Sequence, residues 1–223
     1  MYKFSFVDTW PYLIIAIFFV LCHAYKIKNS SKIIFFVLLF FCIFRYDVGW
    51  DYMSYVNEIK EGIASINESR YEPFSKLIFY LSSSIGFYPF TFFFFAFATL
   101  YLVYKSINLF SENRTLSWLV YSLPLFFFAS LSTIRQSIAT AIILFSYKYL
   151  QENKRIKYLI SILIASLFHI SGIAGLLLWP IIKIPINKKI SFIILFASFL
   201  FPLYIEKIII SFAESYFSGF EFF

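Results

Sequence analysis

The chain has 223 residues, of which 61% are hydrophobic, 24% aromatic and only 14% charged. A soluble protein carries about 25% charged residues, and a chain of this length could not bury so much apolar surface, so the composition excludes an ordinary soluble domain. The net charge of +7 gives no indication of nucleic-acid binding, because basic residues collect on the cytoplasmic loops of membrane proteins. We therefore predict an all-α polytopic membrane protein whose main solvent is the lipid bilayer.

Apolar runs taken in chain order predict about eight transmembrane helices. A perpendicular span needs about 20 residues, and flanking Tyr, Trp and Ser residues extend several of the shorter runs. No signal-peptide cleavage pattern follows the first residues, so we expect the first run to remain as a membrane helix. The runs lie near residues 10–25, 33–44, 89–104, 116–132, 136–150, 158–169, 172–184 and 190–206.

The positions of lysine and arginine predict the orientation of these helices. Cytoplasmic loops carry an excess of basic residues, and the loops near 26–32, 151–157 and 183–189 are rich in lysine. With these loops inside, both termini lie outside and residues 45–72 form an extracytoplasmic loop. That loop holds three basic and six acidic side chains, a balance that suits the outer side.

Two of the apolar stretches are expected to contain breaks. Gly86 and Pro89 divide 73–104 into two helices. The first, 73–87, is polar enough to be an outer interfacial or re-entrant helix, which leaves 89–104 as the crossing. Further along, one continuous helix over 158–184 would carry Lys183 to the outside, so we predict a break between His169 and Gly172.

Arg135 is the residue with the strongest functional indication. It lies with Gln136 between two apolar runs, and a charged side chain in a membrane segment costs about 2.5–3.5 kcal/mol on insertion scales. Such an arginine needs an anionic partner, which could be a ligand or an ion pair with Glu72 or Asp51 that holds helices together. The predicted topology places six ionisable residues at the outer face, namely Arg45, Asp47, Asp51, Glu72, Arg135 and His169.

The other five residues have structural explanations as well. Arg45 ends an apolar run, where an arginine can reach lipid headgroups. Asp47 and Asp51 lie in a polar loop, Glu72 is an acid at the start of a helix, and a lone histidine such as His169 is often a core residue. Because all of them share one predicted depth with Arg135, a site open to the outer face remains the preferred interpretation.

The residue types at this face favour one kind of chemistry. Arginine binds phosphate oxygens in a bidentate fork, and a carboxylate or a neutral histidine can take a proton from an attacking hydroxyl. Together they suit a transfer in which a diphosphate leaves and a hydroxyl attacks. We expect neither a metal nor a cofactor, since Cys22 and Cys42 lack ligand partners and the sequence has no nucleotide-binding glycine motif.

Four short patterns follow one another along most of residues 35–185. They are Arg-Tyr-x-Val-Gly-x-Asp-Tyr-x-x-Tyr at Arg45 to Tyr55, Glu72-Pro73, Ile134-Arg135-Gln136-x-Ile-Ala, and Ala165-x-x-x-His169-x-Ser171. In these patterns, their order and their apolar spacers, the sequence resembles the EpsG family of bacterial membrane proteins, within the Wzy-type O-antigen and exopolysaccharide polymerases.

The resemblance implies a metal-independent glycosyltransferase, multi-pass in the bacterial cytoplasmic membrane. Its substrates would be undecaprenyl-diphosphate-linked oligosaccharides, and its partners the bilayer and other polysaccharide-assembly proteins. By this analogy Arg135 and Arg45 bind diphosphate. His169, Asp51 or Glu72 serves the acceptor hydroxyl, and the sequence does not rank these three. The expected sugar contacts are Gln136, Tyr55 and Asp47.

Two other functions stay open at this point. A flippase or transporter of a lipid-linked sugar would place polar residues at several depths, whereas the predicted cluster lies at one face. A non-catalytic membrane subunit of a polysaccharide assembly complex would use the same cluster structurally. Because family members are usually longer, the resemblance also implies that the single integral membrane domain, 1–223, is truncated at its C-terminus.

Overall fold

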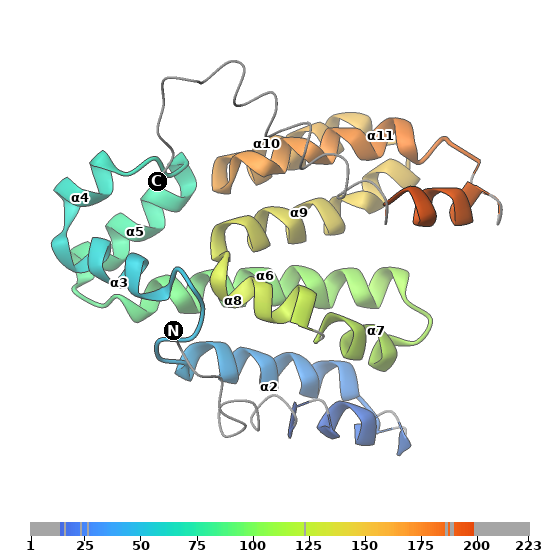
Figure 1. Cartoon of the computed structure of the whole chain (residues 1–223), viewed down its shortest axis with the longest axis horizontal. Helices are drawn as coiled ribbons and strands as arrows, with labels where there is room; N and C mark the ends of the chain where they lie inside the picture. The colour runs from blue at the N-terminus through green and yellow to red at the C-terminus, as the bar shows by residue number, and fades with distance from the viewer. Residues whose placement is uncertain are drawn as a thin grey trace. The chain divides into compact units, whose positions relative to one another are not determined.

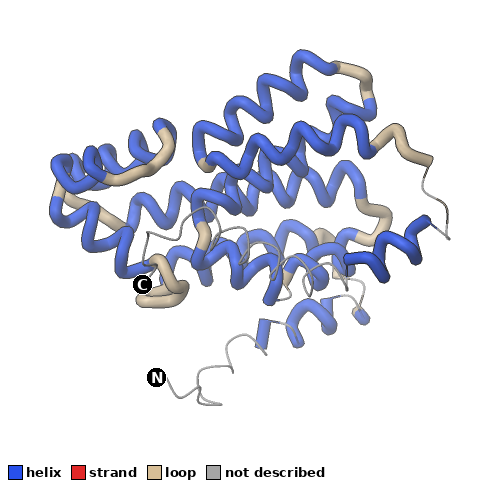
Figure 2. The backbone as a smooth tube through the Cα atoms, turned by 45° about the horizontal axis from the view of Figure 1, so that its top comes forward, coloured by secondary structure: helices blue, strands red, loops and turns tan. Residues whose placement is uncertain are grey.

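The computed structural model describes residues 14–15, 17–22, 24–25, 27–122, 124–185, 187 and 190–198. Within these residues every regular element is a helix (Figure 2), which confirms the predicted all-α class. The predicted termini, the outer parts of runs 10–25 and 190–206, and segment 207–223 lie outside the described residues. The elements are α2 Ser30–Phe44, α3 Tyr52–Glu61, α4 Ile63–Glu68, α5 Pro73–Ile85, α6 Pro89–Phe110, α7 Arg114–Tyr121, a π-helical turn Pro124–Phe128, α8 Ala129–Ser132, α9 Ile134–Gln151, α10 Arg155–Phe168, the 3₁₀ helix η2 Ile170–Leu177 and α11 Leu178–Ile181.

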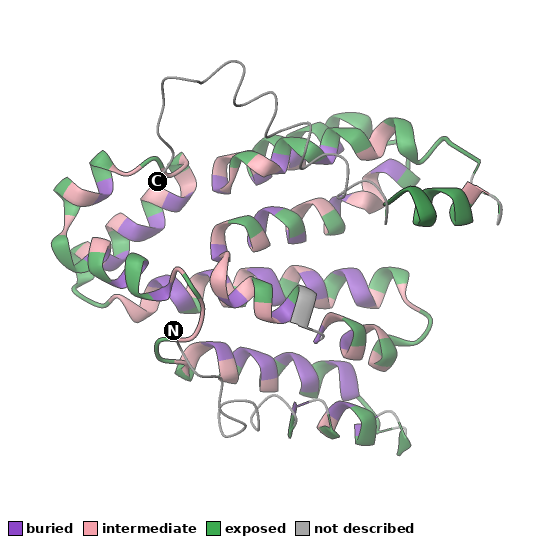
Figure 3. Cartoon of the chain, viewed as in Figure 1, coloured by how far each residue is buried: buried purple, intermediate pink, exposed green. Residues whose placement is uncertain are grey.

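The chain divides into two compact units, Met1–Leu177 and Leu178–Phe223. In the first unit α6 packs between α2 and α9, and α10 packs on the other side of α9 (Figure 1). In the second unit the described residues form α11 and a helical stretch over 190–198, whose residues from 191 onward are all exposed (Figure 3). The candidate site lies wholly in the first unit.

The predicted extracytoplasmic loop 45–72 is mostly helical. It contains α3 and α4, which pack with α5 at one end of the row of long helices (Figure 1). Residues at positions i, i+3, i+4 and i+7 share one face of a helix, and on α3 that face is buried. The buried residues are Tyr52, Tyr55, Val56 and Ile59. Together with apolar residues of α5, α6 and α9 they form a hydrophobic core.

Both predicted breaks are present. Gly86 follows α5 in the left-handed conformation (φ 69°) and donates its N–H to the last carbonyls of that helix, and α6 then begins at Pro89. After α10 ends at Phe168 the chain returns along it as η2. Gly172 lies so close to Ala165 that an added Cβ would be 2.6 Å from its carbonyl carbon.

The helix α6 has 22 residues and is long and apolar enough to cross a membrane. Among the described residues α7 and Phe126–Ser132 could together form a second span, bent by 57°. The predicted total of eight spans stays a prediction, as do the interfacial or re-entrant role of α5 and the outer position of both termini.

Basic residues gather at the end of the row that lies away from α3–α5. The α9–α10 turn there carries Lys154 and Arg155, and Arg114 begins α7. The start of α2, next to Lys28, is tied to α7 at this end by a hydrogen bond of 2.8 Å between Ser30 Oγ and Thr115 Oγ1. Two of the lysine-rich loops thus share one end of the row, and the orientation predicted from them stays a prediction.

Candidate functional site

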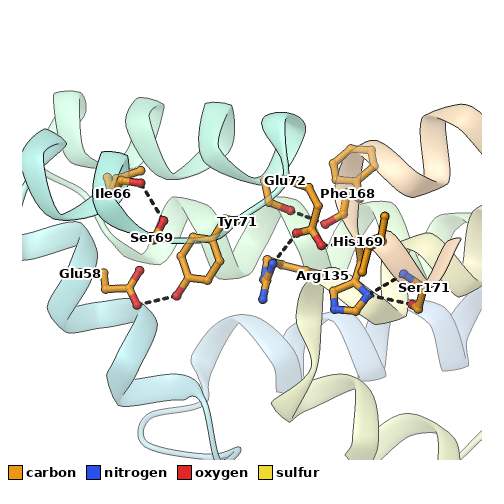
Figure 4. Close-up of polar contacts among 11 residues, drawn as sticks. Glu58, Ile66, Ser69, Tyr71, Glu72, Arg135, Phe168, His169 and Ser171 are labelled. Carbon is orange, nitrogen blue, oxygen red and sulfur yellow. Dashed lines mark hydrogen bonds and ion pairs between the residues drawn. The ribbon is translucent and has the colours of Figure 1, made fainter. Parts of the chain in front are cut away.

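Arg135 and Glu72 form an ion pair at the junction of three segments (Figure 4). Arg135 lies in the first turn of α9, and its Nη1 is 2.5 Å from Glu72 Oε2; the side chains are only 17% and 15% exposed. Glu72 immediately precedes α5, and its other oxygen, Oε1, accepts a hydrogen bond of 2.8 Å from the N–H of Ile170. Glu72 therefore joins the starts of α5 and α9 to the break after α10.

The guanidinium of Arg135 lies over an aromatic ring that is itself held by a carboxylate. Its Cζ is 4.2 Å from the centroid of Tyr71, within the range of a cation–π interaction. The Tyr71 hydroxyl donates a hydrogen bond of 2.5 Å to Glu58 Oε1 on α3. Burial, and then the hydrogen bond to Glu58, raise the pKa of Tyr71, so this hydroxyl stays protonated and keeps donating.

Tyr55, a predicted sugar contact, is buried beside this group. Its ring centroid is 6.0 Å from that of Tyr71. Burial raises the pKa of Tyr55, and a hydrogen bond with Arg135 opposes that rise. Glu58 and Tyr71 were missing from the predicted site. The helical period of α3 could have indicated Glu58, because it lies three positions after Tyr55, on a neighbouring part of the same face.

His169 occupies the break between α10 and η2, close to the ion pair (Figure 4). Its Nδ1 is 2.7 Å from Ser171 Oγ and also accepts a longer contact, 3.2 Å, from the Ser171 N–H. Both contacts engage Nδ1, so among the described residues Nε2 is the ring nitrogen left for a ligand. The end of α10 is fixed by a buried hydrogen bond of 2.7 Å from Ser75 Oγ to the carbonyl of Phe168.

Arg45 contacts the segment that precedes α9 in the chain, and these contacts hold the turn that leads into this helix. Its Nη1 donates to the carbonyl of Leu131 at 2.6 Å, and its Cζ is 5.2 Å from the ring centroid of Phe92. Five residues later in the same loop, Trp50 N–H donates to Ser132 Oγ at 3.1 Å. The structure thus gives Arg45 a contact to the backbone beside the group formed by Arg135, Glu72, Tyr71 and Glu58, the Arg135 cluster. Its role as a second diphosphate ligand stays a prediction.

Among the described residues, the other predicted site residues show no contact with the Arg135–Glu72 ion pair. Asp47 is exposed and has a positive φ of 52°, and Gln136 is exposed on α9. Asp51 is half-buried immediately before α3 and makes no side-chain hydrogen bond to that helix. In the described part of the chain, no three His, Cys, Asp or Glu side chains gather as a metal ion would require.

Gly49, in the pattern from Arg45 to Tyr55, lies against the turn before α9. This close contact gives a testable prediction. Gly49 and Gly62 both have positive φ angles, 109° and 97°. A Cβ at Gly49 would lie 2.5 Å from the Leu131 carbonyl oxygen, whereas one at Gly62 would meet nothing within 4 Å. We expect Gly49→Ala to destabilise the protein by about 1–3 kcal/mol more than Gly62→Ala.

Thermal unfolding of the two purified variants in detergent measures this difference. Backbone strain is similar in both, so Gly62→Ala controls for it, and the comparison isolates the clash. Equal melting temperatures would contradict the close contact between Gly49 and Leu131.

Tyr71 and Glu58 should be energetically coupled. Tyr71→Phe keeps the ring under Arg135 but removes the one hydrogen bond that the described residues give to the Glu58 carboxylate, since Glu58 Oε2 is buried and has no partner among them. A buried acceptor left unsatisfied costs about 1–3 kcal/mol, whereas removal of both partners is nearly neutral. We therefore expect Tyr71→Phe to lower the melting temperature and a further Glu58→Leu change to restore part of it. Additive losses would show that the hydrogen bond is not formed.

A sequence model of the EpsG family matches residues 28–222. The match contains every predicted site residue and all the described helices from α2 onward. No curated protein and no solved structure matches the chain significantly.

Proposed function

Because the chain belongs to the EpsG family, we propose that it is a membrane glycosyltransferase that polymerises lipid-linked oligosaccharide repeat units. Its substrates would carry undecaprenyl diphosphate, and the product would be O-antigen or exopolysaccharide at the outer face of the bacterial cytoplasmic membrane. The observation that carries this proposal is the position of Arg135, held between Glu72 and the Tyr71 ring and beside His169. This supports the proposal, because an arginine is able to bind phosphate and a neutral histidine is able to take a proton.

Arg135 supplies the charge that a diphosphate leaving group needs. Without substrate, Glu72 forms an ion pair with Nη1 of Arg135. A diphosphate therefore binds Arg135 by displacing Glu72. The ring of Tyr71 keeps the guanidinium plane in place during the exchange. Arg135 Nε is buried and has no hydrogen-bond partner among the described residues. A buried donor without an acceptor costs free energy, so an anion that accepts a hydrogen bond from Nε would stabilise the arrangement.

Glu72 is better suited to hold Arg135 than to act as the base. Both of its oxygens are engaged, one by Arg135 and one by the Ile170 N–H, so its contacts suit a structural role. Asp51 has no comparable position beside Arg135. His169 is therefore the proposed base. In the tautomer whose Nδ1–H donates to Ser171 Oγ, which replaces the longer contact that Nδ1 accepts from the Ser171 N–H, the lone pair of Nε2 is free to accept a proton.

The proposed reaction is one displacement at the sugar carbon attached to diphosphate. A hydroxyl oxygen of the incoming lipid-linked unit forms a bond to that carbon, and its proton passes to His169 Nε2. The bond between the carbon and the diphosphate oxygen breaks, and undecaprenyl diphosphate leaves with its charge compensated by Arg135. Gln136, Tyr55 and Asp47 are proposed to contact the sugars, and other polysaccharide-assembly proteins are proposed partners.

The size distribution of surface glycan in a strain lacking this protein tests the proposal. A polymerase defect leaves single repeat units at the surface and removes long chains. A flippase defect removes both, and that outcome would favour the transporter alternative. If the protein were a non-catalytic subunit, alanine changes at Arg135 or His169 would lower the abundance of the assembly complex, without a defect in the polymerisation rate of the complex that remains.

A further inference from the structure

A cavity opens beside α3 and α5, the helices that also carry or adjoin residues of the Arg135 cluster. It has a volume of about 370 Å³ and is lined by residues of α3, of the end of α5 and of the turn before α6. None of its residues takes part in the ion pair or in the contacts of His169. The lining residues are Ile59, Lys60, Ser82, Ser83, Gly86 and Tyr88.

The lining combines groups that suit a sugar. Lys60 Nζ lies 5.1 Å from the ring centroid of Tyr88, so a cation with three N–H donors is held beside an aromatic face. The Ser82 hydroxyl is committed to Thr91 at 2.5 Å, which leaves the half-buried Ser83 as the available hydroxyl of the pair. Sugar rings present an apolar C–H face and a rim of hydroxyls, and both find partners in such a cavity.

The geometry connects this cavity to the Arg135 cluster through two short helices. On α3, Glu58 belongs to the cluster and the next two residues, Ile59 and Lys60, line the cavity. On α5, Glu72 precedes the first residue and Gly86 follows the last. Since α5 has 13 residues, its two ends, at Glu72 in the cluster and at Gly86 in the cavity, lie roughly 20 Å apart along its axis, a distance that an oligosaccharide spans and a single sugar does not.

We propose that this cavity is a distal saccharide subsite, which holds a sugar of the lipid-linked oligosaccharide remote from its diphosphate. The proposal rests on the proposed function for the identity of the ligand. The subsite would select a repeat unit by its length and by a hydroxyl or carboxylate that faces Lys60, while Arg135 holds the diphosphate end. Repeat units too short to reach the cavity would bind through their diphosphate alone.

Binding of a lipid-free oligosaccharide tests the subsite separately from catalysis. The probe is the repeat-unit oligosaccharide released by mild acid from the lipid carrier of a strain lacking this protein, and saturation-transfer NMR measures its binding to the full chain in nanodiscs. Lys60→Met removes the cation. Gly86→Asn places a side chain into the cavity, where a Cβ meets nothing within 4 Å, and asparagine tolerates the left-handed conformation.

We expect both variants to weaken binding about tenfold or more. Lys60→Met loses one charged hydrogen bond, and Gly86→Asn occupies space that the sugar needs. Lys76→Met is the matched control, since it removes one lysine from α5 outside the cavity and should bind as the wild type does. Arg135→Lys should also keep this affinity, because the probe lacks diphosphate. Wild-type affinity in both Lys60→Met and Gly86→Asn would overturn the subsite, whereas long polysaccharide made by Arg135→Lys would refute the proposed function instead.

Discussion

Replacement of Arg135 by lysine is expected to abolish long-chain polysaccharide as completely as replacement by alanine. The guanidinium contacts Glu72 Oε2 at 2.5 Å and lies 4.2 Å from the Tyr71 ring centroid, and the contact with the ring depends on its planar shape. A lysine ammonium keeps the charge but can neither stack in this way nor bind a diphosphate bidentately. Loss of a preorganised donor at a developing charge lowers the rate by roughly 10²–10³-fold.

The measurement is the chain-length distribution of surface glycan in strains that express each variant, with the amount of variant protein in the membrane determined in parallel. Arg114→Lys is the matched control. It makes the same substitution at an exposed arginine of α7, at the opposite end of the helices, and should leave chain length unchanged. Normal long chains from Arg135→Lys would refute the diphosphate role.

His169→Gln is expected to lower the rate of polymerisation by about 10²–10⁴-fold, the usual contribution of a general base. Glutamine is similar in size and can still hydrogen-bond to Ser171, but it cannot accept a proton. Because His169 is only partly buried and lies outside α10, we expect the variant to fold with a melting temperature near that of the wild type. Substrate affinity should change little, since Arg135 and Glu72 remain.

Purified variants in proteoliposomes, supplied with lipid-linked repeat units, separate the rate from the affinity. His23→Gln, at the other histidine of the chain, is the control. A Ser171→Ala variant should show a smaller defect than His169→Gln, because it disturbs only the orientation and tautomer of the imidazole. A wild-type rate in His169→Gln would remove His169 from the reaction and leave Asp51 as the candidate base.

Sequence patterns predicted the places where helices end better than they predicted what lies between them. The breaks at Gly86–Pro89 and at His169 were predictable because glycine and proline have local conformational preferences, and because lysine positions restrict the topology. The helices α3 and α4 were missed because 45–72 is a polar stretch in which acidic residues outnumber basic ones, six to three, and it was therefore interpreted as a loop. The buried face of α3 has the period of a helix, so its detection required a test of spacing rather than of polarity.

Within the site, the sequence identified residues more readily than their partners. Glu72, Arg135 and His169 were predicted to share one face, and the structure brings these three together. Arg45 was expected beside them, yet its hydrogen-bond acceptor is the backbone carbonyl of Leu131. A carbonyl has no signature in the sequence, since every residue carries one. The same reason explains why the contact between Glu72 and the Ile170 N–H could not be foreseen.

Tyr71 shows a different limit. It stands next to Glu72 in the sequence, and aromatic residues are frequent at membrane interfaces, so nothing distinguished it from the other 16 tyrosines among the 17 in the chain. Its position became significant only when the fold placed its ring under Arg135 and its hydroxyl on Glu58.

The central claim is that this protein joins lipid-linked repeat units with release of undecaprenyl diphosphate. Reconstitution of the purified chain with its repeat-unit lipid, followed by mass spectrometry of both products, tests it most directly. We predict that each new glycosidic bond is accompanied by one undecaprenyl diphosphate, and that Arg135→Lys yields neither product. Movement of the intact lipid-linked unit across the bilayer, with no joined units and no free undecaprenyl diphosphate, would contradict the claim.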